Sequence, residues 1–148
     1  MESLKEDMKN DIERIRNVLK VDLDAAIMLY CYMTNNGIEL TDENIKNTYE
    51  NVKELDYKEI DEFIKNHVLN NLSSKEMNIL LRFKRKGMSL ENILEKTKYN
   101  VDEVMDLLNS MRNSCLIDFE QSLENPETVK LTILGERVVK YLRDTYEL

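Results

Sequence analysis

The chain has only three glycines and one proline among its 148 residues. These two residue types build most tight turns and interrupt helices, so a chain with so few of them favours helical segments. Charged side chains make up 34% of the residues and apolar ones 42%, which suits a globular protein with a small core and a well-solvated surface. The composition therefore predicts a mainly α-helical fold.

Negative charge is concentrated in the first half of the chain. Residues 1–70 carry 9 basic and 16 acidic side chains, whereas residues 71–148 carry 12 and 13. The phosphates of a nucleic acid would repel the first half, so any nucleic-acid contact is expected in the second. We expect an acidic helical domain over residues 1–70 and a separate domain over residues 71–148.

Caps and apolar spacing outline the helices of residues 71–113. Ser73 and Glu76 form a capping-box pattern at the start of a helix that we expect to end at Gly87. Ser89 and Asn100 are the caps of a short and a longer helix, and Glu103 follows Asn100 at the capping-box spacing. The inward stripe of the longer helix is predicted to consist of Val101, Val104, Met105, Leu108 and Met111.

An extended segment and a final helix follow. Leu116–Phe119 is predicted to be a strand, with a turn over Glu124–Glu127 and a second strand over Val129–Leu131 that pairs back as a β-hairpin. Thr132 caps the last helix. The order helix, short helix, longer helix, hairpin, helix is that of a winged helix.

Residues 73–142 resemble the winged helix-turn-helix domain of MarR-like and related prokaryotic regulators. The glycine that usually precedes the strand is replaced here by Ser114 and Cys115. The resemblance implies a C-terminal winged helix-turn-helix with a small β-hairpin wing, and with it nucleic-acid binding at the level of fold. The matching segments are Gly87–Leu90, Asn100–Val104, Leu116–Ile117 and Leu131–Gly135.

The first 70 residues predict a four-helix interaction domain. Asp22, Thr41 and Asp56, the last with Glu59 at the capping-box spacing, begin the second to fourth helices. Residues 26–45 share the rhythm of residues 77–94, which would make this half a degenerate helix-turn-helix. Residues 26–52 are also similar to the helical dimerisation domain of the acidic ribosomal stalk proteins of archaea. The apolar stripe of the first helix consists of Leu4, Met8, Ile12, Ile15 and Leu19.

The sequence offers no catalytic or metal-binding constellation. His67 is expected at the inward edge of the fourth helix as a partly buried packing residue, with a catalytic base as the alternative. Cys31 and Cys115 lie in apolar stretches and are read as reduced, buried thiols. One histidine and two distant cysteines match no zinc-ligand spacing, and three isolated glycines build no phosphate-binding loop. We expect a protein that is not an enzyme and uses no metal or cofactor.

The longer helix of the predicted winged helix is the one that enters the major groove in this fold. Three carboxylates near its start would mostly repel phosphates. The run from Arg82 to Lys86 is expected to be a solvated helix end, where its positive charges interact favourably with the helix dipole. The outward face of the longer helix is predicted to carry Asp102, Glu103, Asp106, Asn109, Ser110, Arg112 and Asn113. The residues expected to contact duplex DNA are Lys96, Lys98, Asn100, Asn109, Arg112 and Asn113.

The function expected from these patterns is that of a DNA-binding transcriptional regulator. It would form a homodimer through the N-terminal helices or the last helix, because the apolar stripe of the first helix needs a cover. The alternative is a winged-helix protein–protein interaction module of a transcription or chromosome-maintenance complex, without direct DNA readout. The sequence shows no secretory signal and no apolar run long enough to span a bilayer, so we expect a cytoplasmic location and no membrane partner.

Overall fold

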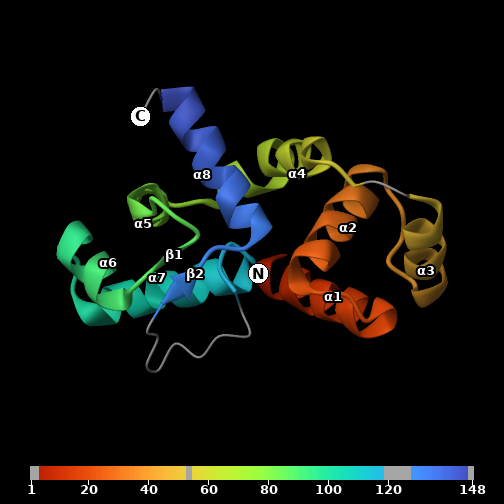
Figure 1. Ribbon diagram of the computed structural model, residues 1–148, viewed down its shortest axis with the longest axis horizontal. Coiled ribbons are helices and arrows are strands. Elements are labelled where there is room, and N and C mark those ends of the chain that lie inside the picture. The colour runs from red at the N-terminus through yellow and green to blue at the C-terminus, as the bar shows by residue number, and fades with distance from the viewer. Residues whose placement is uncertain (1–3, 53–54, 119–127, 147–148) are drawn as a thin grey trace.

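The computed structural model describes residues 4–52, 55–118 and 128–146. Within these ranges the chain is mainly helical, with one small antiparallel pair of strands, which confirms the helical fold class. The molecule is longest along the line that joins α3 at one end to α6 at the other (Figure 1). None of the helices in the described ranges is long and apolar enough to cross a membrane.

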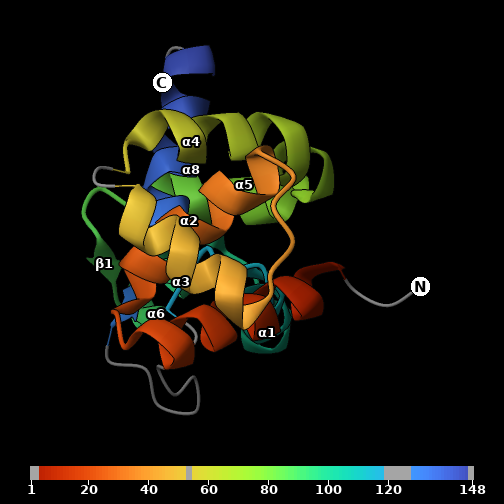
Figure 2. The ribbon, with the colours of Figure 1, turned by 90° about the vertical axis from the view of Figure 1, so that its right-hand side faces the viewer.

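The four helices predicted in the first half are present. They are α1 (Leu4–Leu19), α2 (Leu23–Asn35), α3 (Asp42–Asn51) and α4 (Tyr57–Phe63). Asp22, Thr41 and Asp56 cap the last three through side-chain acceptors, as predicted. Figure 2 shows α3 as the outermost helix, in front of α2 and between α1 and α4.

The capping box expected at the start of α4 is not formed. Asp56 accepts from the backbone N–H of Lys58, while the Glu59 side chain turns toward α2 and accepts from Asn35 Nδ2 at 3.0 Å. Glu59 therefore bonds to Asn35 of α2 and not to the backbone N–H of Asp56, as a capping box would require.

The end of α4 widens into a π-helical turn, η1 (Ile64–Val68), and tightens into a 3₁₀ turn, η2 (Leu69–Asn71). The prediction that His67 faces inward is wrong, because this side chain is exposed. The wide turn changes the angular position of each residue relative to an α-helix. His67 still packs, since its ring lies 4.9 Å from that of Phe63, centroid to centroid.

The second half contains four helices and the two strands. These are α5 (Ser74–Arg82), β1 (Gly87–Met88), α6 (Leu90–Thr97), α7 (Val101–Asn113), β2 (Val129–Lys130) and α8 (Ile133–Tyr146). The capping box of Ser73 with Glu76 is confirmed, as are the caps at Ser89 and Asn100. Thr132 accepts from the backbone N–H of Gly135 and so caps α8, also as predicted.

Gly87 does not end α5, contrary to the prediction. The helix stops at Arg82, four residues of loop follow, and Gly87 pairs with Lys130 in the sheet. The position suits glycine because a Cβ there would lie 2.7 Å from Thr128 Cγ2. The sequence pattern indicated a breaker, but the pairing partner lies more than 40 residues away and left no local signal.

Three segments lie side by side in the sheet region. β1 pairs with β2, with Met88 opposite Val129. On the other side of this segment an isolated bridge joins Ile117 to Leu131, and the Asp118 N–H donates to the Lys130 carbonyl. The predicted pairing of the two extended segments is thus present at Ile117 and Leu131. The sequence did not predict the third segment, β1, which pairs with β2. Phe119 and the predicted turn over Glu124–Glu127 lie outside the described residues.

Two details of the predicted α7 faces are wrong. Val101 is 53% exposed, because it is the first residue of the helix and lies ahead of the turn that packs against the core; Val104, Leu108 and Met111 are buried as expected. Ser110 was expected to face outward, but its hydroxyl donates to Glu76 Oε2 on α5 at 3.2 Å.

The buried apolar side chains of both halves belong to one hydrophobic cluster. α4 and α2 contact α8, and α1 contacts α7, so α8 stands between the two groups of helices (Figure 1). Cys31 and Cys115 are buried free thiols in this cluster, as expected. Met8, Ile12 and Ile15 of the α1 stripe are covered by the chain itself, which removes the reason that the sequence gave for a dimer.

Candidate nucleic-acid interface

A tight turn joins α6 to α7 and holds two of the predicted contact residues. Lys98 adopts the left-handed conformation with φ of 64°, and its N–H donates to the Leu94 carbonyl at the end of α6. Asn100 then accepts from the Glu103 N–H at 2.8 Å and starts α7. Lys98 and Asn100 are both exposed on this turn, but the amide oxygen of Asn100 is engaged as a cap.

A basic hollow of about 330 Å³ lies between the end of α5, β1 and α6. None of the described residues that line it is acidic. Arg82 is held in place there, because its Nε and one terminal nitrogen donate to Asn78 Oδ1 at 3.2 and 3.1 Å. The basic hollow is lined by Arg82, Lys84, Arg85, Gly87, Met88, Ser89, Asn92, Lys96 and Thr128.

The start of α6 contributes to the same hollow. Ser89 Oγ accepts from the backbone N–H of Asn92 at 3.1 Å, and both residues line the basic hollow. A helix N-terminus carries partial positive charge and backbone N–H donors, both of which favour an anion. Four cationic side chains and a helix start thus converge on one concave surface.

The carboxylates of α7 are less crowded than the sequence indicated. Glu103 forms an ion pair with Lys75 of α5, and this hydrogen bond raises the pKa of Lys75. The Lys75 ammonium also lies 5.3 Å from the centre of the Tyr99 ring. Asp102 and Asp106 remain exposed. One of the three negative charges is therefore matched by a fixed positive charge.

The six predicted contact residues do not form one cluster with the hollow. Among them only Lys96 lines it. Asn109 and Asn113 are exposed along α7, and Arg112 is half-buried near its end. The structure therefore places one predicted lysine beside Arg82, Lys84 and Arg85, and leaves the others on the turn and on the face of α7.

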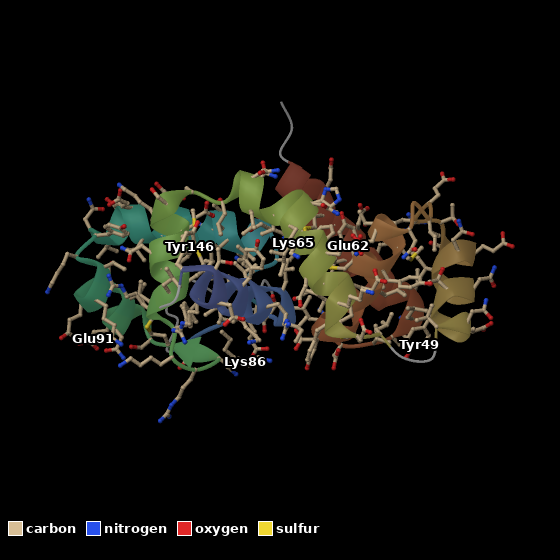
Figure 3. The ribbon with its side chains drawn as sticks, turned by 90° about the horizontal axis from the view of Figure 1, so that it is seen from above. Tyr49, Glu62, Lys65, Lys86, Glu91 and Tyr146 are labelled. Carbon is tan, nitrogen blue, oxygen red and sulfur yellow. The ribbon has the colours of Figure 1, made fainter. Side chains whose placement is uncertain are left out.

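The residues that the sequence-based list omitted had a visible signal. The run from Arg82 to Lys86 stands out in the sequence, but it was predicted to be a solvated helix end. The basic residues of this run lie on two different surfaces. Arg82, Lys84 and Arg85 line the basic hollow, whereas Lys86 lies beside α8 and pairs with Asp24 Oδ2 at 3.4 Å. Figure 3 shows Lys86 there, apart from Glu91 at the α6 end of the molecule. Only the backbone path through β1 reveals which basic residues face α6.

The described ranges give little support for a metal site or a catalytic cysteine. They contain no group of three His, Cys, Asp or Glu side chains arranged to hold a metal ion. Burial raises the pKa of the Cys115 thiol to about 12 and that of Cys31 well above its usual value. Both thiols are thus protonated at neutral pH, a state in which a cysteine is a poor nucleophile.

Comparison of the chain with protein-family models, with curated proteins and with solved structures gives no match. The assignment of a function therefore depends on the geometry of these residues.

Proposed function

We propose that the chain is a winged-helix DNA-binding protein that acts as a transcriptional regulator. The order α5, β1, α6, α7, extended segment 116–118, β2 and α8 supports the winged-helix assignment. So does the hydrogen bonding, in which the segment containing β2 lies between β1 and residues 116–118. In such a domain α6 and α7 are the helix-turn-helix pair, and α7 is the helix presented to the major groove.

The basic hollow is the observation that carries the proposal. Lys and Arg side chains together with a helix N-terminus are the groups that most often contact DNA phosphates. In the basic hollow Arg82, Lys84, Arg85 and Lys96 line the same surface as Ser89 and Asn92 at the start of α6, with no described acidic residue among the lining. Such contacts position a duplex without reading its sequence, so affinity is expected to depend strongly on salt.

Base contacts would come from the polar residues of α7. Asn109 and Asn113 are exposed one turn apart, on the outer side of the helix. An asparagine amide can pair with adenine, and a carboxylate such as Asp106 can accept from the amino group of cytosine. The ion pair of Glu103 with Lys75 reduces the repulsion that would oppose this approach.

A protein-interaction module is the second candidate. The observation that favours it is the exposure of Asp102 and Asp106 on α7, where a basic segment of a partner could dock. The two candidates differ in which charges matter. DNA binding needs the cations of the basic hollow, whereas docking of a basic protein needs the carboxylates of α7.

The test is fluorescence anisotropy with a labelled mixed-sequence duplex at low salt. The wild-type chain is expected to bind, and the variant Lys84→Glu/Arg85→Glu/Lys96→Glu to bind at least ten-fold more weakly. Lys46→Glu on α3, at the opposite end of the molecule, is the single-site control for a general effect of charge, with Lys96→Glu as its counterpart. All the substituted side chains are exposed, and circular dichroism confirms that each variant is folded.

Two results would overturn the proposal. One is the absence of duplex binding by the wild-type chain at low salt. The other is an equal loss of affinity in Lys46→Glu and Lys96→Glu, which would make the effect one of net charge alone. Asp102→Asn/Asp106→Asn is expected to leave DNA affinity unchanged or to increase it, because it removes negative charge from α7.

A further inference from the structure

A cavity of about 160 Å³ lies where the two halves of the chain meet. Its walls come from α1, α2, the α4–η1 segment and the end of α7 with the residues that follow. The labelled Glu62 and Lys65 in Figure 3 mark the α4–η1 segment that forms one wall. This central cavity is lined by Met8, Tyr30, Thr34, Phe63, His67, Val68, Asn71, Leu72, Ser114 and Leu116.

The walls of the central cavity are mostly apolar and partly aromatic. The rings of Tyr30 and Phe63 meet edge to face with centroids 5.6 Å apart, and His67 packs on the other side of Phe63. Cavities of roughly 150 Å³ with apolar walls take up benzene in proteins, and the volume here is similar, although His67 and Asn71 at its edge are exposed to solvent. The volume therefore suits one six-membered ring.

The polar side chains at the cavity are those of Tyr30, Thr34, His67, Asn71 and Ser114. None of the described residues that line it is an Asp, Glu, Lys or Arg, and burial raises the pKa of Tyr30 to about 12, so its hydroxyl stays neutral. The Ser114 hydroxyl donates to the carbonyls of Ser110 and Met111 at the end of α7, which leaves its oxygen lone pairs to accept. A charged ligand would lose its hydration here without a counter-charge, whereas a neutral one would not.

The backbone of one wall also departs from regular structure. η1 is a π-helical turn, a feature that occurs mostly as single turns within α-helices and is frequent at functional sites. It supplies His67 and Val68 to the cavity, and η2 supplies Asn71. Because these turns link the N-terminal helices to α5, the cavity borders the segment of chain that joins the two halves.

We propose that the central cavity binds a small neutral ring compound with a single hydroxyl group, about the size of phenol. The ring would lie against Phe63 and Leu116, and the hydroxyl would donate to Ser114 or Tyr30. This site is separate from the basic hollow, and its occupancy does not require that the chain binds DNA.

The test uses the full chain without DNA and phenol as the probe. Isothermal titration is expected to give one phenol per chain with a dissociation constant of about 1 mM or lower, which corresponds to roughly 4 kcal/mol. Intermolecular nuclear Overhauser effects are expected between phenol ring protons and the Phe63 ring of the wild-type chain. Potassium benzoate, which is charged, is expected to bind at least ten-fold more weakly.

A substitution that fills part of the cavity can be compared with the same substitution elsewhere in the chain. Thr34→Leu places a larger side chain at the wall and is expected to reduce phenol affinity at least ten-fold, whereas Thr145→Leu, the same change at the exposed end of α8, is expected to leave it unchanged. The proposal is overturned by non-saturable phenol binding, or by Overhauser effects only to residues outside the central cavity. The wild-type Overhauser measurement decides the question even if Thr34→Leu fails to fold.

Discussion

The Asp24 carboxylate caps a helix that begins 109 residues later in the chain. Its Oδ1 accepts from the backbone N–H of Ile133, the first residue of α8, at 3.0 Å. Its other oxygen lies 3.4 Å from Lys86 Nζ, next to β1. One side chain of α2 therefore fixes both the start of α8 and the approach to the sheet, which ties the two halves of the chain together.

Replacement of Asp24 with alanine is expected to lower the free energy of unfolding by about 1 kcal/mol, the usual effect of losing a helix cap. Asp24→Asn keeps an oxygen acceptor and loses only a partly exposed ion pair, so its effect should be below about 0.5 kcal/mol. Urea denaturation followed by circular dichroism measures both. Equal destabilisation by the two substitutions would mean that the charge, and not the cap, is what matters at this position.

Of the three glycines, Gly135 leaves the least room for a side chain. A Cβ there would lie 2.1 Å from the Leu116 carbonyl oxygen, a backbone atom that also accepts from the Thr132 N–H. Gly135→Ala is therefore expected to destabilise the protein by about 3 kcal/mol, at the upper end of overpacking effects. Thermal melts provide the measurement. A melting temperature within the error of the wild type would show that α8 and the segment 116–118 are not packed this closely.

Stability is expected to fall at alkaline pH. Burial raises the pKa of Cys31, of Cys115 to about 12, and of Tyr30 to about 12. The folded state therefore retains protons that the unfolded chain releases from about pH 9 upward, so the stability contribution is complete below that pH and is lost above it.

Urea midpoints at pH 7.5, 9 and 10.5 measure this decline. A Cys31→Ala/Cys115→Ala variant removes two of the three groups and should decline less steeply over the same range. A wild-type midpoint that stays constant to pH 10.5 would contradict the burial of these groups. Ellman's reagent gives an independent check, because the thiols of the native chain are expected to react only after denaturant is added.

Helix starts were the best predicted part of the fold. Asp22, Thr41, Ser73, Ser89 and Asn100 each cap a helix where the sequence indicated one. A cap involves a side chain and a backbone N–H two or three residues away, so all of its information lies within one turn. The burial of Val104, Leu108 and Met111 was predicted correctly for the same reason, because helical spacing is also a local pattern.

The errors have the opposite cause. Gly87 was read as a helix terminator, but its role is set by Thr128 and Lys130 in the sheet. Glu59 was predicted to complete a capping box but bonds to Asn35 on α2. Ser110 was predicted to face outward but bonds to Glu76 on α5. Each of these contacts joins residues that are at least 24 positions apart, and no local pattern reports such a partner.

The candidate site was predicted only in part, because its residues also come together through long-range contacts. Lys96 was identified from its place beside the helix-turn-helix, but its grouping with Arg82 and Arg85 depends on how the chain returns through β1. The pairing of Glu103 with Lys75 likewise joins α7 to α5. The sequence showed the charges, and the fold decides which of them share a surface.

The salt dependence of duplex binding tests the central proposal most directly. If the basic hollow contacts phosphates, the logarithm of the binding constant should fall linearly with the logarithm of salt concentration, with a slope of about −3 or steeper. Lys96→Ala should reduce the magnitude of that slope by about 1, while Lys46→Ala should leave it unchanged. An absence of binding at about 50 mM salt, or a slope that Lys96→Ala does not alter, would contradict the assignment of the basic hollow as a DNA contact surface.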